Sequence, residues 1–393
     1  MEYMAKNIPL WQITTWDKNF NNVDKEWQPK TIKYKYLLSD ELDSLRVDDG
    51  DIRILYTGKD VGYTTEELAG DNISEGEVVS IPWGGIPTVK YHKGKFVTGD
   101  NRIATSNDTS KLTNKYLYYY LQGNIGEIAS YYRGASLKHP CMKDVLKMTI
   151  SYPSVQEQEK ICSQFDMLEW LIEARKQELQ LLDDLIKARF VELFGNPVLN
   201  EKGWESNLLA QLTLKIGSGA TPKGGREAYQ EEGIALIRSM NVYNGKFEYK
   251  DLAHISDEQA AKLDNVIIKE SDVLLNITGA SVARSCVVPN QILPARVNQH
   301  VCIIRCKECI EPIFLNRLLI DDNYQKLLWE IAGSGATREA ITKQQVERLK
   351  IILPPIELQN QFAAFVAQVH KSKLMFQKLH QKLNILQKKA GDI

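Results

Sequence analysis

Two long stretches of the chain carry apolar residues at helical spacing. Residues 154–194 contain no glycine and no proline, and their apolar side chains recur in steps of 3, 4 and 7 residues. This spacing is typical of a helix that packs along another helix. The predicted seam of this first helix consists of Ile161, Phe165, Leu168, Ile172, Leu179, Leu182, Ile186 and Leu193.

The ends of this helix and the start of a second one can also be recognised. Pro153 and Ser154 favour a helix start, and Gly195-Asn196-Pro197 favours a stop. A helix of about 40 residues spans roughly 60 Å. Residues 355–390 repeat the pattern, with a predicted seam of Phe362, Phe365, Val369, Ser372, Phe376, Leu379, Leu383, Leu386 and Ala390.

The chain before each helix alternates short apolar runs with turn residues, which predicts strands. In the first block these runs are Ile52–Tyr56, Val78–Ile81, Thr88–Tyr91 and Lys95–Thr98. In the second block they are Ile234–Ile237, Val266–Ile268, Val273–Ile277 and Val301–Ile304. The Tyr-rich residues 115–121 indicate a helix packed on the first sheet. The predicted fold class is therefore mixed α/β.

The second half of the chain repeats the first. The helix opening Pro-x-x-x-x-Gln, from Pro153 to Gln158, returns 201 residues later, and the Gly-Ala-Ser-Leu and Gly-Ala-Thr-Arg segments at 134–137 and 335–338 have the same displacement. A repeat of this length indicates a duplicated domain plus helix rather than a solenoid of short units. The predicted segments are a domain at 1–152, a helix at 153–196, a domain at 197–353 and a helix at 354–393.

Charge distinguishes the two helices. Residues 154–195 hold five basic and nine acidic side chains, whereas residues 356–391 hold six basic and one acidic. Amphipathic helices of opposite charge are expected to pack on each other, and an antiparallel pair with one domain at each end suits the path of the chain. The alternative is that each helix packs only on its own domain.

Composition restricts the possible partners and the compartment. A chain of 393 residues accommodates two or three domains, and its net charge is −1. Since proteins that bind nucleic acid alone are usually basic, this chain either does not bind it or shares the phosphate contacts with a partner. We expect no signal peptide and no membrane span, because no apolar run is long enough. Six cysteines without a secretory signal indicate the reducing cytoplasm.

The ordered set of motifs resembles the specificity subunits of type I restriction–modification systems. The motifs are the two Pro-x-x-x-x-Gln openings, the helix exit 190–197, the entry Lys202-Gly203-Trp204-Glu205, and the segments 217–222, 272–275 and 298–301. Segments 77–80 and 101–103 are weaker counterparts in the first block. The resemblance covers essentially the whole chain, and its specificity lies in the block–helix–block–helix order.

The resemblance implies a function without catalysis in this chain. Each globular block would be a target recognition domain that reads one half of a split site in double-stranded DNA. The paired helices would set the spacing and bind two methyltransferase subunits, which restriction subunits join. S-adenosylmethionine, and ATP with Mg for restriction, would belong to those partners, and no cofactor would belong to this chain. The modest net charge fits shared phosphate contacts.

Two other classes of function remain open. Cys302, Cys306 and Cys309 have the C-x3-C-x2-C spacing of a radical iron–sulfur enzyme. However, Cys302 lies inside a predicted strand, and the first block has no equivalent cysteines, so free thiols are the simpler interpretation. A scaffold whose domains bind proteins is the other alternative. We find no P-loop, no methyltransferase pocket motif and no metal-ligand histidine pair, and therefore predict no catalytic or metal site.

The residues expected to contact DNA are polar or aromatic side chains on loops, because these match the hydrogen-bonding edges of bases. In the first block we expect Thr57, Lys59, Tyr63, Thr64, Trp83, Lys90, Tyr91, Arg102 and Lys138. In the second block we expect Ser218, Thr221, Lys223, Arg238, Ser239, Asn241, Asn276, Thr278, Arg284 and Arg338. For each of them the alternative is a solvated loop or a hydrogen bond within a turn.

Overall fold

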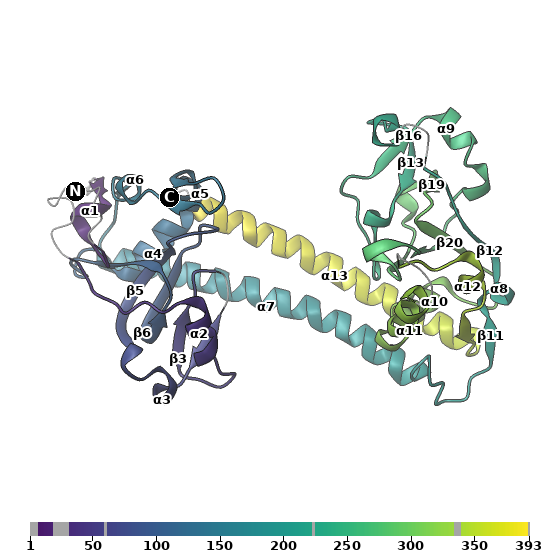
Figure 1. The fold of residues 1–393 in the computed structure, drawn as a ribbon, viewed down its shortest axis with the longest axis horizontal. Helices are drawn as coiled ribbons and strands as arrows, with labels where there is room; N and C mark the ends of the chain where they lie inside the picture. The colour runs from purple at the N-terminus through teal and green to yellow at the C-terminus, as the bar shows by residue number, and fades with distance from the viewer. Residues whose placement is uncertain (1–6, 19–30, 59–60, 222–224, 334–338, 392–393) are drawn as a thin grey trace. The chain divides into compact units, whose positions relative to one another are not determined.

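Two long helices, α7 (Val155–Phe194) and α13 (Ile356–Gly391), occupy the stretches where the apolar seams predict them (Figure 1). The computed structural model describes residues 7–18, 31–58, 61–221, 225–333 and 339–391, with the backbone alone for 226, 228 and 375–391. The chain forms two units, one containing residues up to 176 and from 377 onwards, the other residues 177–376. Each unit thus combines one globular domain with parts of both long helices.

The first unit is built on a six-stranded sheet with the order β2-β7-β5-β6-β3-β4. Its strands are β2 (Thr14–Trp16), β3 (Ile52–Leu55), β4 (Gly62–Thr64), β5 (Ser74–Pro82), β6 (Lys90–Thr98) and β7 (Asn101–Ser106). Its short helices are α1 (Leu10–Ile13), α2 (Ser39–Leu45), α3 (Glu66–Ala69), α4 (Asn114–Gly123), α5 (Ile125–Ser130) and α6 (Met142–Val145). Two small pairs complete it: β1 (Ile8–Pro9) with β10 (Thr149–Ile150), and β8 (Tyr132–Arg133) with β9 (His139–Pro140).

The second unit contains a four-stranded and a three-stranded sheet. The first has the order β12 (Thr213–Ser218), β20 (Val301–Cys306), β17 (Val273–Asn276), β18 (Ser285–Val287), and the other the order β16 (Ala253–Ile255), β13 (Ile234–Ile237), β19 (Ala295–Val297). Two pairs are β11 (Ser206–Leu208) with β21 (Lys350–Ile352), and β14 (Val242–Tyr243) with β15 (Lys246–Phe247). The shorter helices are α8 (Leu209–Leu212), α9 (Asp257–Ala261), α10 (Pro312–Leu319), α11 (Asp322–Gly333) and α12 (Lys343–Glu347).

Both units share one antiparallel four-stranded scaffold, β2-β7-β5-β6 in the first and β12-β20-β17-β18 in the second. The register is equivalent, because Val79 pairs with Ala104 in the first and Val273 with Ile304 in the second. Val79 is therefore the counterpart of Val273, one residue away from the match that segments 77–80 and 272–275 give when they are laid side by side. Such a slip exchanges the two faces of a strand, so only the pairing partners reveal the true correspondence.

Most of the predicted strands are present, with two differences. The run Lys95–Thr98 and the last two residues of the run Thr88–Tyr91 belong to the single strand β6, which passes through Gly94, whereas Thr88 and Val89 precede it. Residues 266–268 form no strand: a 3-10 turn, Asp264–Val266, precedes an extended connection. Val266 and Ile268 are nevertheless buried, so the apolar run records packing rather than strand pairing.

One buried glutamine attaches α7 to the first domain. Gln158 has no exposed surface, and its Oε1 accepts from the backbone N–H of Thr113 at 2.9 Å. Its Nε2 donates to the carbonyl oxygens of Lys111 at 2.6 Å and Pro153 at 2.9 Å. Thr113 caps α4, where its Oγ1 accepts from the N–H of Tyr116. The amide therefore satisfies backbone groups that burial would otherwise leave unpaired.

Gln359 makes the same attachment in the second unit. It too has no exposed surface; its Oε1 accepts from the N–H of Glu311 at 2.9 Å, and its Nε2 donates to the carbonyl of Pro354 at 2.7 Å. Glu311 caps α10 through a bond from the N–H of Phe314. The glutamine of the repeated Pro-x-x-x-x-Gln motif is thus a structural joint between each long helix and the capped helix of its domain.

The two long helices pack on each other within the second unit. Phe190 and Phe194 of α7 each lie 5.5 Å, ring centre to ring centre, from Phe362 of α13. Asp183 Oδ1 lies 2.6 Å from Lys373 Nζ. Residue numbers fall along α7 as they rise along α13, from the contact of Phe190 with Phe362 to that of Asp183 with Lys373. These portions of the two helices therefore run antiparallel. The predicted contact of oppositely charged helices is confirmed.

The seam residues divide between two environments. In the second unit Ile186, Phe362 and Val369 belong to the core, with Leu182, Leu193 and Phe365 packed against it, and Leu179 is half-buried. In the first unit Ile172 is buried and Ile161, Phe165 and Leu168 are half-buried. The side chains of Phe376, Leu379, Leu383, Leu386 and Ala390 lie outside the described residues.

In the first unit α7 also packs on its own domain. The ring of Phe165 stacks on Tyr119 of α4 at 4.7 Å, and Asp166 of α7 lies 2.6 Å from Lys115 Nζ. Acidic side chains of α7 therefore form ion pairs both with the first domain, through Asp166, and with α13, through Asp183. In the part of the chain that the structure describes, neither these helices nor any other is long and apolar enough to cross a membrane.

Candidate nucleic-acid interface

Hydrogen bonds gather several loops at one end of the first sheet. The bonds run from Asn101 Nδ2 to Leu55 O (2.8 Å), from Trp83 N to Asp100 O (3.0 Å), and from Gly85 N to Lys138 O (3.1 Å). We call residues 55–57, 83–85, 90, 98–102 and 138–139 the first loop cluster; Lys90 joins it because its Nζ donates to the carbonyl of Tyr56. These loops connect strands of the rigid scaffold and thus form a fixed surface.

The second unit gathers loops in the same way. The bonds run from Ile277 N to His300 O (3.0 Å), from Gly279 N to Glu339 O (2.9 Å), from Gly219 N to Asn298 O (3.1 Å), and from Asn298 N to Ile237 O (3.1 Å). We call residues 217–221, 237–241, 276–279, 298–300 and 339–340 the second loop cluster. Its first two bonds are the counterparts of the last two in the first loop cluster, so the duplication extends to the loops.

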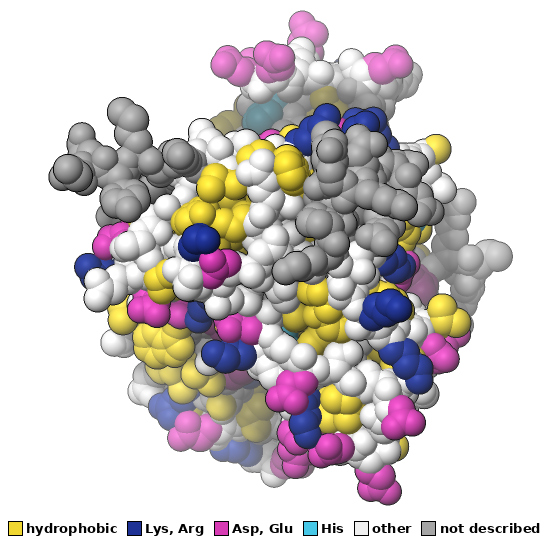
Figure 2. Space-filling view, turned by 90° about the vertical axis from the view of Figure 1, so that its left-hand side faces the viewer, with side chains coloured by type: hydrophobic (Ala, Val, Ile, Leu, Met, Phe, Trp, Pro, Cys, Tyr) yellow, Lys and Arg dark blue, Asp and Glu magenta, His cyan; other side chains and the backbone are white. Residues whose placement is uncertain are grey.

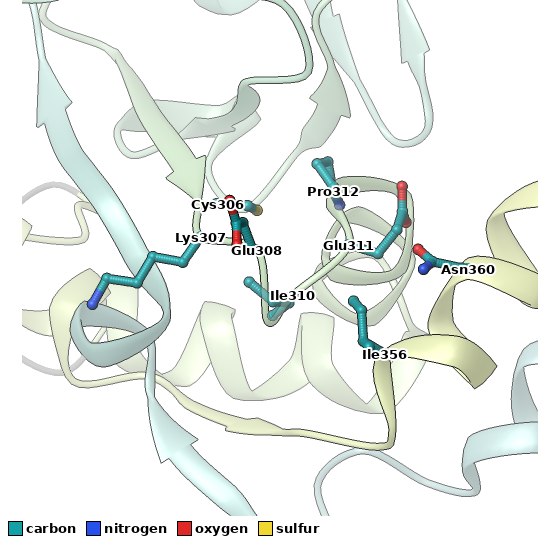
Figure 3. A pocket seen from close by; sticks show the side chains of 8 residues that line it. All are labelled: Cys306, Lys307, Glu308, Ile310, Glu311, Pro312, Ile356 and Asn360. Carbon is teal, nitrogen blue, oxygen red and sulfur yellow. The ribbon is translucent and has the colours of Figure 1, made fainter.

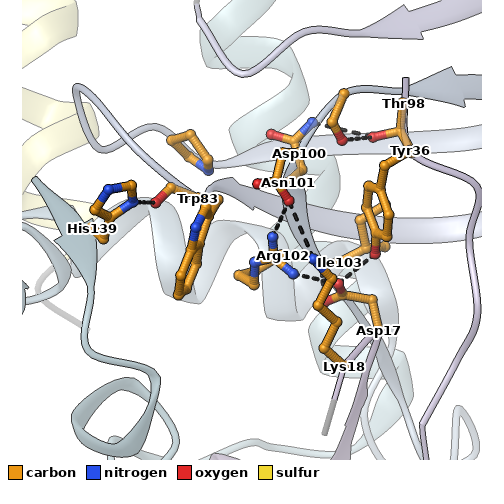
Figure 4. Close-up of polar contacts among 12 residues, drawn as sticks. Asp17, Lys18, Tyr36, Trp83, Thr98, Asp100, Asn101, Arg102, Ile103 and His139 are labelled. Atoms are coloured by element: carbon orange, nitrogen blue, oxygen red, sulfur yellow. Dashed lines mark hydrogen bonds and ion pairs between the residues drawn. The ribbon is translucent and has the colours of Figure 1, made fainter. Parts of the chain in front are cut away.

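The first loop cluster is organised around a buried ion pair (Figure 4). Arg102 is 1% exposed and its Nη1 lies 2.9 Å from Asp17 Oδ2. Asp17 also accepts hydrogen bonds from the N–H of Ile103 at 2.8 Å and from the hydroxyl of Tyr36. Arg102 Nη2 donates to Asp100 Oδ1. Burial raises the pKa of the Asp17 carboxyl, and the Tyr36 hydroxyl, Arg102 and the Ile103 N–H oppose that shift. Arg102 therefore neutralises a buried carboxylate.

Trp83 lies over this ion pair. The guanidinium carbon of Arg102 is 4.5 Å from the centre of the indole ring, a cation–π distance. His139 packs 5.3 Å from the same ring and bonds the carbonyl of Trp83 through Nδ1 at 2.7 Å (Figure 4). The half-buried indole is consequently held in one orientation, and Lys138, next to His139 in the chain, is exposed.

The second loop cluster contains a chain of polar side chains joined by hydrogen bonds. Thr278 Oγ1 lies 2.6 Å from His300 Nδ1, and the Nε2 atoms of His300 and Gln299 are 3.2 Å apart. Thr221 donates its hydroxyl to Gln299 Oε1. Gln299 and Thr221 are exposed, whereas Thr278 and His300 are half-buried. The chain thus connects three loops and ends at the surface.

Four residues expected to contact DNA are buried, and these expectations are corrected. Thr64, Asn241 and Asn276 have no exposed surface, and Arg102 is 1% exposed. Asn276 Nδ2 donates to the Ser239 carbonyl at 2.8 Å, and Asn241 Nδ2 donates to that of Glu248 at 3.0 Å. Buried side chains cannot reach a base edge, so these residues support the loops from within.

The other expected residues fall into three groups. Those in the loop clusters and at least partly exposed are Thr57, Trp83, Lys90, Lys138, Ser218, Thr221, Arg238, Ser239 and Thr278. Tyr63, Tyr91 and Arg284 lie elsewhere; their partners are Arg53, Glu77 and the ring of Tyr243, respectively. Lys59, Lys223 and Arg338 lie outside the described residues.

Sequence reasoning missed several residues that organise these sites. Gln299 and His300 stand in a segment quoted only for its resemblance, although two polar residues directly before a buried strand are a recognisable loop signal. Phe190 and Phe194 were missed because α7 leaves the heptad spacing after Ile186, and packs through steps of four residues there. The partner of Arg102, Asp17, is 85 positions away, a separation that no local pattern reveals.

The three cysteines considered for a cluster occupy different environments. Cys302 is buried in the core, where burial raises the pKa of its thiol to about 12, whereas Cys309 is exposed. Cys306 borders a shallow pocket with Glu311, Ile356 and Asn360 (Figure 3), and burial raises the pKa of its thiol to about 12. Among the described residues, no three His, Cys, Asp or Glu side chains are placed to hold a metal ion. The geometry therefore gives no support to an iron–sulfur centre.

Charges of both signs are mixed on the surface. On the face of the first unit that Figure 2 shows, Lys and Arg side chains are interspersed with Asp and Glu. Cationic side chains in contact with carboxylates include Lys95 with Glu66 and Lys93 with Glu77. Such a face provides weak general attraction for phosphates, so selectivity must come from particular loops.

The chain therefore consists of two domains built on one duplicated sheet scaffold, each joined to a long helix by a buried glutamine. The family model for the type I restriction modification DNA specificity domain matches residues 31–183 and 201–386. The chain belongs to this family.

Individual relatives agree with this membership. The specificity subunit of the type I restriction enzyme EcoBI from Escherichia coli is 21% identical over 287 residues, which cover 66% of this chain and 59% of that protein. The MjaIX specificity subunit of Methanocaldococcus jannaschii is 25% identical over 295 residues, 68% of this chain and 65% of that protein. The chain thus spans about three fifths of these curated relatives.

Solved structures show the same fold. The S subunit of a type I restriction-modification system from M. genitalium superposes with a TM-score of 0.63 at 14% identity, covering 100% of this chain and 96% of that one. A chain from a structure that describes complex assembly and conformational transition of the type I R-M system superposes with a TM-score of 0.54 at 17% identity, covering 89% and 95%.

Proposed function

We propose that this chain is the DNA specificity subunit of a type I restriction–modification complex, and that it reads one half of a split DNA site with each loop cluster. The observation that carries this proposal is the duplicated loop cluster, two surfaces of equal construction and different chemistry. A site with two unlike halves requires such an arrangement. The family membership and the names of the relatives support the same conclusion.

The proposed contacts with DNA come from the partly exposed cluster residues. In the first loop cluster these are Thr57, Trp83, Lys90 and Lys138. In the second they are Ser218, Thr221, Arg238, Ser239 and Thr278. Lysine and arginine match guanine or phosphate, and hydroxyl groups match either base edges or phosphate oxygens.

The proposed partners are two methyltransferase subunits, bound along α7 and α13, and restriction subunits that join them. Catalysis, S-adenosylmethionine and ATP with Mg would reside in those subunits. The net charge of −1 supports this division, since a chain that bound DNA alone would need an excess of cations. A cytoplasmic location is supported by six free thiols.

Methylome sequencing tests the proposal directly. Cells that express this chain with its methyltransferase should acquire a methylated motif of two short specified halves around an unspecified spacer, and cells that lack only this chain should not. A co-purifying complex with an active methyltransferase but no new motif would contradict the proposal and favour a protein-binding scaffold.

A further inference from the structure

Gln299 is an exposed residue of the second loop cluster, and its neighbours in the chain are held by hydrogen bonds. Its neighbour Asn298 is 5% exposed; the Asn298 N–H donates to Ile237 and its Oδ1 accepts from the N–H of His300 at 3.0 Å. The carbonyl of His300 accepts from the N–H of Ile277 at 3.0 Å. The backbone is therefore held on both sides of Gln299, while its side chain faces solvent.

A glycine allows the neighbouring loop to approach. A Cβ atom on Gly219 would lie 1.8 Å from the carbonyl oxygen of Val297, so no other residue fits without a shift of the backbone. This close approach brings Thr221 to the amide of Gln299, where its hydroxyl donates to Oε1. The loop thus supports the Gln299 side chain through a hydrogen bond and leaves it exposed to solvent.

The hydrogen bonds engage both polar atoms of the Gln299 amide. Its Nε2, which can only donate, lies 3.2 Å from His300 Nε2, and its Oε1 accepts from the hydroxyl of Thr221. Each polar atom of the amide then has one internal bond. One N–H of Nε2 and one lone pair of Oε1 remain available, side by side, for an outside ligand.

We infer that Gln299 reads an adenine in the DNA half-site recognised by the second unit, with His300 and Thr221 as its positioning residues. An adenine presents the N7 acceptor and the N6 donor on its major-groove edge, which are complementary to the free donor and acceptor of this amide. Guanine presents two acceptors there and does not match. The inference rests on the proposed function, because it assigns a base to one residue of that surface.

The equivalent positions of the first unit hold other residues. Gly99 takes the place of Gln299, and Asp100, whose carboxylate binds Arg102 and Lys18, takes the place of His300. A carboxylate engaged by two cations offers no paired donor and acceptor. The inference therefore concerns one half-site only, and the other half serves as an internal control.

The test is the relative affinity of the assembled methyltransferase complex for its methylome-defined target and for every single-base substitution of that target. The unsubstituted complex should lose roughly 5- to 150-fold affinity when one A·T pair of the second half-site is replaced. Gln299→Ala should abolish that preference at this one position, and keep the preferences elsewhere. His300→Ala should weaken the preference at the same position and, combined with Gln299→Ala, should add nothing there.

The matched control is Gln291→Ala, since Gln291 is an exposed glutamine of the same unit outside the loop cluster. Gln291→Ala should leave the relative affinities for the target and for all its single-base substitutions unchanged. An unaltered profile for Gln299→Ala, or weakening shared equally by all positions, would overturn the inference, because a phosphate contact behaves in the second way. If no complex bound any bipartite target, the proposed function itself would fail, and the two failures are therefore distinguishable.

Discussion

The two loop clusters occupy the same place on the same scaffold and share two backbone hydrogen bonds, but they differ in the side chains that support them. The first contains a buried ion pair between Arg102 and Asp17, covered by the Trp83 indole. The second contains a chain of hydrogen-bonded polar side chains that includes His300 and Gln299. At the scaffold position of Arg102 the second unit has Cys302, a buried thiol. Duplication has therefore kept the loop geometry while the interior that supports it diverged.

What is common to both units is the connection between domain and helix. Gln158 and Gln359 bind equivalent backbone groups, and Thr14 and Thr213 each donate a hydroxyl to the first carbonyl of the short helix before them. These contacts involve the backbone, which does not change when a sequence diverges. The joint can therefore remain constant while the recognition surface varies.

The largest expected effect is a difference in stability loss between substitutions at equivalent buried positions of the two units. Arg102→Leu should destabilise the first unit by about 3–5 kcal/mol, because it leaves the Asp17 carboxylate buried without its cation. Cys302→Ala, at the equivalent position, should cost the second unit only about 1 kcal/mol. Urea denaturation, with hydrogen exchange to assign the loss to a unit, measures both. Equal losses would show that the ion pair does not support the first loop cluster.

The stability of the Arg102→Leu variant should depend on pH in a direction that the pKa of Asp17 predicts. Burial already raises the pKa of Asp17 above 3.8, and removal of Arg102 removes one of the effects that oppose the shift. The folded variant then takes up the proton more readily than the unfolded chain, so its stability falls as pH rises above about 4. The deficit relative to the unaltered chain should be smaller at acid pH than at neutral pH.

Loss of either buried glutamine joint, Gln158 or Gln359, should lower stability by an intermediate amount that is the same in both units. Gln158→Leu and Gln359→Leu should each destabilise their own unit by about 2–3 kcal/mol, since each leaves a buried N–H and carbonyls unpaired. Gln156→Leu and Gln361→Leu are exposed controls on the same helices and should change stability by less than about 0.5 kcal/mol. A loss in one unit alone would mean that the two joints are not equivalent.

The smallest expected effect concerns the ion pair between the helices in the second unit. The side chains of Lys373 and Asp183 are 18% and 43% exposed, so solvent screens their attraction. Lys373→Glu should cost about 1 kcal/mol or less, Lys371→Glu should cost almost nothing, and Asp183→Lys should restore the loss when combined with Lys373→Glu. Thermal unfolding at two salt concentrations measures this, and failure of the double variant to recover would assign the pair no role.

The sequence predicted those features that depend on local periodicity. The seams of α7 and α13 and the strands β3, β5, β13, β17 and β20 follow from apolar spacing, which is set by helix and strand geometry. Pairing is not local, so the merging of two runs into β6 and the one-residue correction between the units needed the structure.

The candidate site was less predictable for a physical reason. Arg102 and Asn276 have the side chains of DNA-reading residues, yet both are buried. Their partners, Asp17 and the Ser239 carbonyl, are distant in the sequence. Whether a polar side chain faces solvent or the interior depends on such remote partners. Gln299, by contrast, was overlooked although its position before β20 is visible in the sequence.

The boundaries of the units lie inside helices, after residues 176 and 376. The second unit is thus 200 residues long, within one residue of the repeat of 201. In genetic terms, it is a cassette whose two ends lie within one residue of equivalent positions in the two long helices. Recombination between two such genes at these helices would exchange a complete recognition surface with its own glutamine joint. If each loop cluster reads one half-site, as proposed above, such an exchange would change one half of the target in a single event.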